Sequence, residues 1–204
     1  MLTIIYLIAI TAEAMSGALV AGRRNMDMFG VALIAFITAL GGGTVRDILL
    51  GHFPVNWTQH PSYIYLTITA GLSTMVLARF MHRLQKLFLL LDAMGLIAFT
   101  IIGCNVAEQL GYSIPVVIMA GIITGVFGGI LRDILCHQTP QVLQHELYAS
   151  VSLLVAVLYL VMQHYGVNND ITLLVSFSSG LIMRLAAIRW SWSLPVFYYA
   201  PERW

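Results

Sequence analysis

The chain has 204 residues, of which 59% are hydrophobic and only 9% charged, and its mean hydropathy is +0.87. A soluble domain of this size carries about 25% charged residues, so the composition excludes a soluble globular protein and indicates an integral membrane protein. The net charge of +1 gives no support for nucleic-acid binding.

Apolar windows long enough to cross a hydrocarbon core about 30 Å thick follow one another along the chain. They predict seven transmembrane helices, at residues 2–21, 28–51, 62–80, 87–108, 114–136, 146–165 and 171–188. No Lys or Arg precedes Arg23, so the first window lacks the basic start of a cleaved signal peptide and is expected to remain as a helix. The short connections predict a single membrane domain over residues 1–204.

Basic residues gather at alternate connections between these windows. Eight of the ten follow the first window, join the third to the fourth, or end the chain: Arg23, Arg24, Arg79, Arg83, Lys86, Arg184, Arg189 and Arg203. With seven spans, all eight lie on one side of the membrane, and the positive-inside rule assigns that side to the cytoplasm. We therefore expect the N-terminus outside and the C-terminus in the cytoplasm.

The second and fifth windows each contain glycines followed by an Arg-Asp pair. The two segments are Gly41-Gly42-Gly43-Thr44-Val45-Arg46-Asp47 and Phe127-Gly128-Gly129-Ile130-Leu131-Arg132-Asp133. Each glycine weakens a helix by about 1 kcal/mol relative to Ala. A buried charge costs several kcal/mol unless it faces water or a partner. Helices broken at glycine, with charges beside the break in both halves of a membrane chain, indicate a pathway for an ion or solute.

Both segments belong to an internal repeat with a constant offset of 86 residues. Without a gap, the offset maps Gly17 to Gly103, Thr38 to Thr124, Gly42-Gly43 to Gly128-Gly129, Arg46-Asp47 to Arg132-Asp133, and Pro54 to Pro140. Three helices per repeat is an odd number, so the two copies must insert with opposite orientations. The predicted fold is an all-α integral membrane protein. It has two inverted three-helix repeats, about 1–80 and 87–166, and a seventh helix with a tail at about 170–204.

Cation passage requires oxygen ligands that replace water without binding the ion too tightly. A bent helix can turn backbone carbonyls toward a cavity, which makes the backbones of Gly41, Gly42, Gly43, Gly128 and Gly129 the first candidates. Alternatively, these glycines only allow close helix packing. The hydroxyls of Thr38, Thr44 and Thr124 could add oxygens, or each could bond the carbonyl four residues earlier.

The predicted intramembrane charge network consists of Arg46, Asp47, Arg132, Asp133, Glu13 and Asp92. Adjacent residues on a helix do not face each other. We therefore expect pairing between the repeats: Arg46 with Asp133 or Asp92, and Arg132 with Asp47 or Glu13. The arginines then act as structural clamps, the alternative being fixed charges that tune a pore. Glu13 and Asp92 correspond to Phe99 and Tyr6 under the offset, which suggests separate roles or a proton-linked site. The alternative for each is a buried acid that is neutral or salt-bridged.

Together with Glu13-Ala14-Met15-Ser16-Gly17-Ala18-Leu19, the two glycine segments make the chain resemble the bacterial branch of the trimeric intracellular cation (TRIC) channel superfamily, a branch also labelled glycine transporter domain. The resemblance covers nearly the whole chain. It implies a homotrimer in the bacterial inner membrane, with a pore in each protomer where kinked second and fifth helices cross. It further implies conduction of monovalent cations, with potassium the expected ion. Phe127 stands where a third glycine is expected, which predicts a less open or more rigid second half.

The sequence thus favours a cation channel over a secondary transporter of glycine or another small zwitterion. In a transporter, half-helix N-termini would hold the carboxylate, and Glu13 or Asp92 the amine. The chain contains no nucleophile elbow and no His-Glu-x-x-His, so we expect no enzyme. Its histidines lack the spacing of a zinc site on one helix. We expect no metal site and no cofactor besides the permeant cation, with membrane lipid as a possible bound partner.

Overall fold

The computed structural model describes residues 2–78, 84–144 and 147–195. These residues form eight α-helices and one short 3-10 helix, so the described part of the chain is all-helical, as predicted. In chain order the elements are α1 (Leu2–Arg23), α2 (Met28–Leu50), α3 (Asn56–Gln59), α4 (Ser62–Ala78), α5 (Leu84–Gln109), α6 (Ile114–Leu135), η1 (Gln141–Leu143), α7 (Ala149–His164) and α8 (Asn169–Trp190).

Each predicted apolar window coincides with one long helix, and the ends agree to within three residues where the structure describes them. Residues 79–80 and 146, at the ends of two windows, lie outside the described residues. Five helices, α1, α2, α5, α6 and α8, are long and apolar enough to cross a membrane. Helices α4 and α7 are apolar but shorter, with 17 and 16 residues. The sequence does not predict α3 and η1, because a single turn carries no readable periodicity.

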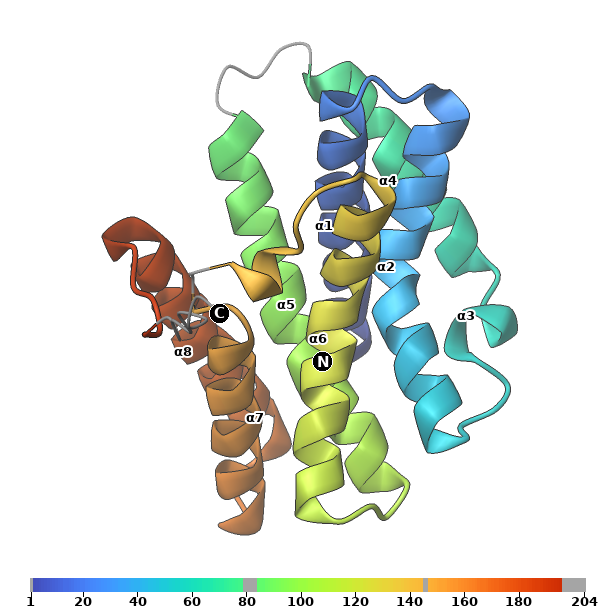
Figure 1. Ribbon diagram of the computed structural model, residues 1–204. Coiled ribbons are helices and arrows are strands. Elements are labelled where there is room, and N and C mark those ends of the chain that lie inside the picture. Colours follow the sequence, from blue (N-terminus) through green and yellow to red (C-terminus); the bar gives the residue numbers. More distant parts are fainter. Residues whose placement is uncertain (1, 79–83, 145–146, 196–204) are drawn as a thin grey trace, which may run out of the picture.

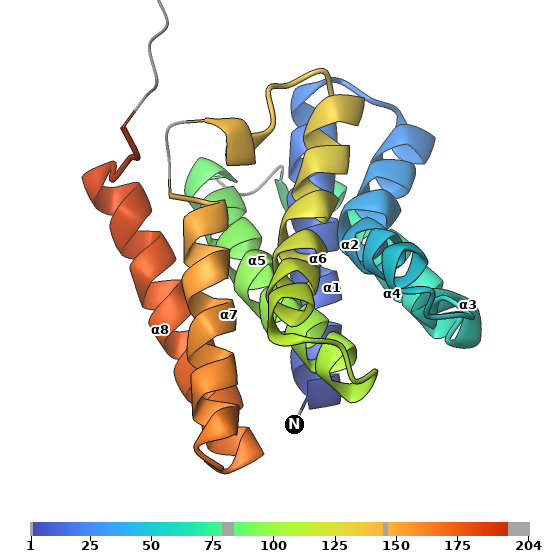
Figure 2. The same cartoon turned by 60° about the horizontal axis from the view of Figure 1, so that its bottom comes forward.

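The long helices lie side by side in one bundle (Figures 1 and 2). Helices α1, α2 and α4 pack together on one side, and α5, α6 and α7 form a second group that carries α8 on its outer face. The two groups meet where α1 packs on α5 and α2 packs on α6. Helix α2 ends at the bottom of Figure 1 and α6 at the top, so these two helices run in opposite directions.

Helices α2 and α6 end in the same way, 86 residues apart. Gly51 and His137 both adopt the left-handed conformation, with φ of 64° and 50°. In both cases the following N–H bonds back to the carbonyl of the motif aspartate, from His52 to Asp47 and from Gln138 to Asp133, each at 2.8 Å. A backward hydrogen bond of this kind closes the last turn of a helix that ends at a left-handed residue. The bounds of α1 to α4 likewise recur in α5, α6, η1 and α7 at nearly the same offset.

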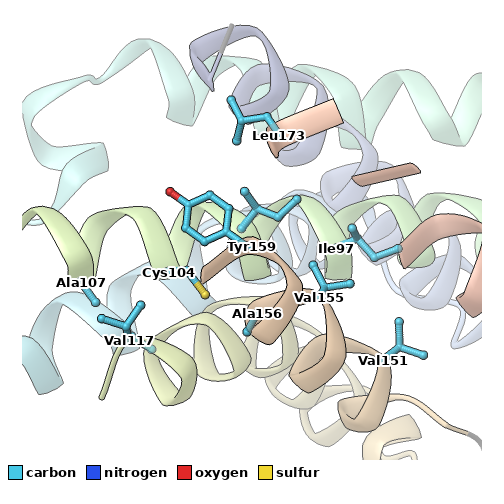
Figure 3. Packing of buried hydrophobic residues seen from close by; sticks show 11 residues of the cluster. Ile97, Cys104, Ala107, Val117, Val151, Val155, Ala156, Tyr159 and Leu173 are labelled. Atoms are coloured by element: carbon cyan, nitrogen blue, oxygen red, sulfur yellow. The ribbon is translucent and has the colours of Figure 1, made fainter. Parts of the chain in front are cut away.

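Small and β-branched side chains fill the interior of the bundle. The largest buried cluster joins α5, α6, α7 and α8, and Figure 3 shows Ile97, Val117, Val155, Tyr159 and Leu173 converging there. A second cluster contains buried alanines of α1 and α2 packed on α5. Small residues let helix backbones approach closely, which is how membrane helices associate when lipid is as apolar as the core. Large apolar side chains such as Phe29, Ile48 and Leu154 are exposed on the outside.

The basic residues behind the predicted topology separate into two kinds. The end of α1 with Arg23, the start of α5 with Lys86 and the end of α8 with Arg189 point toward the same side of the bundle (Figure 1), as expected. Arg184 does not lie at a helix end. It is fully buried in α8, where its guanidinium lies 4.7 Å from the centroid of the Tyr148 ring and donates to the Leu147 carbonyl at 3.3 Å. Arg79, Arg83 and Arg203 lie outside the described residues.

Candidate functional site

The central contact between the two halves is a backbone contact between α2 and α6. A Cβ atom at Gly42 would overlap the carbonyl oxygen of Thr124, and one at Gly128 would overlap the carbonyl oxygen of Thr38. Thr38 and Thr124, like Gly42 and Gly128, are 86 residues apart. The two contacts are therefore equivalent under the offset of the repeat. Only glycine fits at either position without moving a helix backbone.

The predicted helix breaks are absent. Helix α2 continues through Gly41, Gly42 and Gly43, and α6 continues through Gly128 and Gly129. A gap in the helix would leave carbonyls without partners in an apolar environment, at a cost of several kcal/mol each. The glycine penalty of about 1 kcal/mol per residue is smaller. For Gly42 and Gly128, the alternative of close packing is the one that the contacts support.

The other motif glycines have different neighbours. A Cβ at Gly41 would lie 2.8 Å from Cδ1 of Leu131 across the interface, whereas one at Gly43 would meet only Nη2 of Arg46, at 3.8 Å. At Gly129 it would lie 3.3 Å from the Tyr148 hydroxyl. Gly43 and Gly129 therefore face the charged residues that follow them rather than the helix crossing.

The three candidate threonines all bond within their own helix. Thr38 donates to the Ile34 carbonyl at 2.6 Å, Thr124 to the Ala120 carbonyl at 2.6 Å, and Thr44 to the Leu40 carbonyl at 2.8 Å. This is the second alternative that the sequence left open. The Thr44 oxygen also accepts from Trp57 Nε1 at 3.0 Å. A hydroxyl that donates keeps its acceptor capacity, so Thr38 and Thr124 can still offer an oxygen.

The first charged cluster contains Arg46 and Asp47 at the end of α2. Arg46 donates to Asp47 Oδ1 from Nε at 3.0 Å and from Nη2 at 2.7 Å. His52 Nδ1 lies 3.1 Å from the same oxygen, and the backbone N–H of Asn56 donates to Oδ2 at 3.3 Å. Both charged side chains are buried. The cluster therefore contains one arginine neutralised by one carboxylate.

The second charged cluster surrounds Arg132, which is fully buried. Its Nε donates to Asp133 Oδ1 at 2.8 Å, and its Nη1 donates at 2.7 Å both to Asp92 Oδ1 on α5 and to Ser16 Oγ on α1. The guanidinium also lies 5.0 Å from the centroid of the Phe88 ring, a favourable cation–π distance. Arg132 thus joins α1, α5 and α6.

The expected pairing between repeats is wrong. Each arginine bonds the aspartate that follows it, because its long side chain can curl back along the helix end to reach a neighbouring carboxylate. The added ion pair of Arg132 with Asp92 stays within the second repeat. Ser16 supplies the bond between repeats, and it is a residue that sequence reasoning missed. Its position three residues after Glu13, on the same face of α1, is the signal that could have identified it.

Glu13 lies beside the second cluster without joining it. Its side chain is buried against α5, where a Cβ at Gly95 would overlap the carboxyl group. Neither Oε2 of Glu13 nor Nη2 of Arg132 has a hydrogen-bond partner. The expected bond between Glu13 and Arg132 is therefore not formed in this arrangement.

The space beside the two clusters differs. A cavity of about 20 Å³ next to the first cluster is lined by Tyr6, Gly43, Thr44, Asp47 and Trp57, among others, and this is room for about one water molecule. The corresponding space next to the second cluster, between Gly129, Asp133 and Tyr148, has no room for water. The space beside the second cluster is thus the more closed of the two, and Tyr148 rather than Phe127 lines it. Tyr148 stands where the first repeat has Ser62.

Comparisons with known proteins identify relatives of this chain. A family described as Glycine transporter matches residues 3–79 and 89–164, two stretches that begin 86 residues apart. The chain is 40% identical over 185 residues to a UPF0126 membrane protein of Vibrio cholerae, covering 90% of this chain and 77% of the relative. It is 38% identical over 186 residues to the UPF0126 inner membrane protein YadS of Escherichia coli, covering 90% of each.

A solved structure has the same fold over nearly the whole chain. It is the TRIC trimeric intracellular cation channel orthologue from Rhodobacter sphaeroides, with a TM-score of 0.90 and 32% sequence identity. The match covers 93% of this chain and 98% of that one.

The two adjacent glycines of α2 provide a matched test of the helix crossing. Gly42→Ala should destabilise the protein by about 1–3 kcal/mol, because the new methyl group meets the backbone of α6 and cannot be accommodated by a rotamer change. Gly43→Ala should be neutral or stabilising by up to about 1 kcal/mol, since the site is open and Ala favours the helix. Thermal unfolding of both variants in detergent would measure the difference, and equal melting temperatures would contradict the crossing.

The two arginines provide a second matched pair. Arg132→Ala leaves Asp92 and Asp133 buried without their cation and should cost about 3–5 kcal/mol. Arg46→Ala leaves one carboxylate that still has His52 and the Asn56 N–H as partners, so the loss should be about 1–3 kcal/mol. The yield of folded protein by size exclusion and the unfolding temperature measure both. A larger loss for Arg46→Ala would contradict the assignment of Arg132 as the central clamp.

Proposed function

This chain belongs to the glycine transporter family, the bacterial branch of the trimeric intracellular cation channel superfamily, and we propose that it conducts monovalent cations, chiefly potassium, through a pore in each protomer of a homotrimer. Members of this family are membrane channels and not enzymes. The observation that carries the proposal is the pair of buried, neutralised arginine clusters beside the α2–α6 crossing, in a fold shared over nearly the whole chain with a cation channel.

The conduction pathway runs beside the α2–α6 crossing. The cavity beside the first cluster offers oxygens from Asp47 and Thr44, and Thr124 of α6 lines the same cavity. These are the ligand types that replace the hydration shell of a monovalent cation. Arg46 and Arg132 do not repel the ion, because each is bonded to aspartate. They serve as clamps that hold the ends of α2 and α6.

The fold of the pathway is an inverted pair of three-helix repeats with seven membrane crossings. The reciprocal contacts of Gly42 and Gly128, the recurring left-handed residues and the opposite directions of α2 and α6 support this arrangement. The basic helix ends support a cytoplasmic C-terminus and an external N-terminus, in the inner membrane as described for the Escherichia coli relative. The cavity beside Asp47 then lies toward the outside and the cluster of Arg132 toward the cytoplasm. Lipid covers the exposed apolar side chains.

A secondary transporter of glycine is the second candidate, and the description of the family favours it. The size of the cavity argues against it. A cavity of about 20 Å³ holds about one water molecule, which is less than a glycine zwitterion requires. A hydrated cation that sheds water can enter such a space in single file.

Planar-bilayer recording in a potassium gradient discriminates between the two candidates. For a channel we expect discrete unitary currents that reverse near the potassium equilibrium potential and are unchanged by glycine. For a transporter the same protein would give no unitary current and saturable uptake of labelled glycine into proteoliposomes. The second result would overturn the proposal.

Tyr148 provides a test of the pathway inside the second half. The Tyr148 ring fills the space beside the second cluster, whereas the equivalent space beside the first cluster is open. The first repeat has Ser62 at the equivalent position. Tyr148→Ser should raise the open probability or the unitary conductance several-fold. Tyr148→Phe, which keeps the ring and its contact with Arg184, should behave like the wild type. Equal currents for Tyr148→Ser and the wild type would remove this space from the pathway.

A further inference from the structure

Glu13 is the buried acid that the structure leaves without a partner. Four acids are buried in the described ranges, and three of them, Asp47, Asp92 and Asp133, accept hydrogen bonds from arginine. Glu13 is 3% exposed, and its Oε2 accepts and donates no hydrogen bond. The side chain has no room to move toward α5, because the carboxyl group already packs against the backbone at Gly95.

The charges around Glu13 are mostly of its own sign. Asp92 of α5 and Asp133 of α6 act on it with the same charge, Arg132 of α6 acts with the opposite charge, and the Tyr148 hydroxyl lies in the same electrostatic environment. Helices α2 and α4 also pack on α1, and their described residues add no charged group to this set. With Glu13 ionised, three carboxylates would share one guanidinium. No hydrogen bond to Oε2 would offset the cost of burying that additional charge.

A metal ion does not fit this position as well as a proton does. A metal cation requires several oxygen ligands at once, and the described residues contain no group of three acidic, histidine or cysteine side chains placed to hold one. A proton requires only the one carboxylate oxygen that is free.

We propose that Glu13 is a proton-binding site, protonated in the arrangement described here, and that loss of this proton leaves a carboxylate that pairs with Arg132. The O–H bond of the carboxyl group breaks and the proton leaves to water. The resulting carboxylate takes Nη2 of Arg132, which has no partner in the present arrangement. Asp92 keeps its bond to Nη1. The proton-binding site does not depend on the proposed function. Only the predicted change in cation current rests on it.

Infrared difference spectroscopy of the purified protein in lipid nanodiscs tests the proton directly. The wild type should show the C=O band of a buried, protonated carboxylic acid that disappears as the pH is raised, and Glu13→Gln should lose the band. Glu108→Gln is the matched control, since Glu108 is an exposed acid on α5, and should keep it. Should Glu13→Gln fail to assemble, Glu13→Asp should keep a band that titrates at a different pH. A spectrum unchanged by either Glu13 variant would overturn the proposal.

Bilayer currents at a series of pH values test the coupling. Deprotonation adds negative charge beside a cation pathway, so the wild-type current should rise several-fold across the pH range in which the band disappears. Glu13→Gln should hold the low current at every pH. A Glu13→Gln channel with the wild-type pH dependence would overturn the coupling. A wild type without any current would refute the proposed function, and the infrared band would still decide whether Glu13 carries the proton.

Discussion

The contact of two helix backbones at Gly42 and Gly128 determines where everything else in the site lies. Each motif arginine follows its glycine by four residues, about one helical turn or 6 Å along the axis. Because α2 and α6 run in opposite directions, the two arginines lie on opposite sides of the crossing. A side chain at either glycine would separate the helices and move both charged clusters away from the interface. The absence of a side chain at Gly42 and Gly128 thus determines where the two charged clusters lie.

The same local structure leads to different environments in the two halves. Both arginines bond the next aspartate, and both aspartates accept a backbone N–H from the segment after the helix. The neighbours then differ, because Asp92 corresponds to Tyr6 under the offset. The first cluster is balanced in charge and opens onto a small cavity, whereas the second has an excess of carboxylates and is closed by Tyr148. Helix α8, which has no counterpart in the repeat, supplies the Arg184 that holds the Tyr148 ring.

The sequence predicts the scaffold better than it predicts the contacts. Hydropathy anticipates the positions of the seven main helices because a helix that crosses a membrane presents about 20 apolar residues to lipid, although α4 and α7 are shorter than that. The offset of 86 anticipates which residues are equivalent. The continuity of α2 through Gly43 could not be predicted, since the cost of glycine and the benefit of close packing are of similar size. The partners of Arg46 and Arg132 could not be predicted either, because a long side chain reaches several acids and the choice depends on tertiary placement. Tyr148 lies just before a helix, where no periodicity indicates that it faces the site.

A buried arginine is compatible with cation conduction only when its charge is cancelled, and the two halves cancel it in different ways. At Arg46 one carboxylate suffices, so the adjacent space can stay polar and hydrated. At Arg132 two carboxylates bind the guanidinium and a third lies close by without a bond. That surplus would be unfavourable in a region without room for water unless one acid stays neutral. Glu13 is the acid that can do so at least cost, because it is the only one of the three with no hydrogen bond in the described part of the chain to lose. The half with the surplus is thus the half whose charge can change.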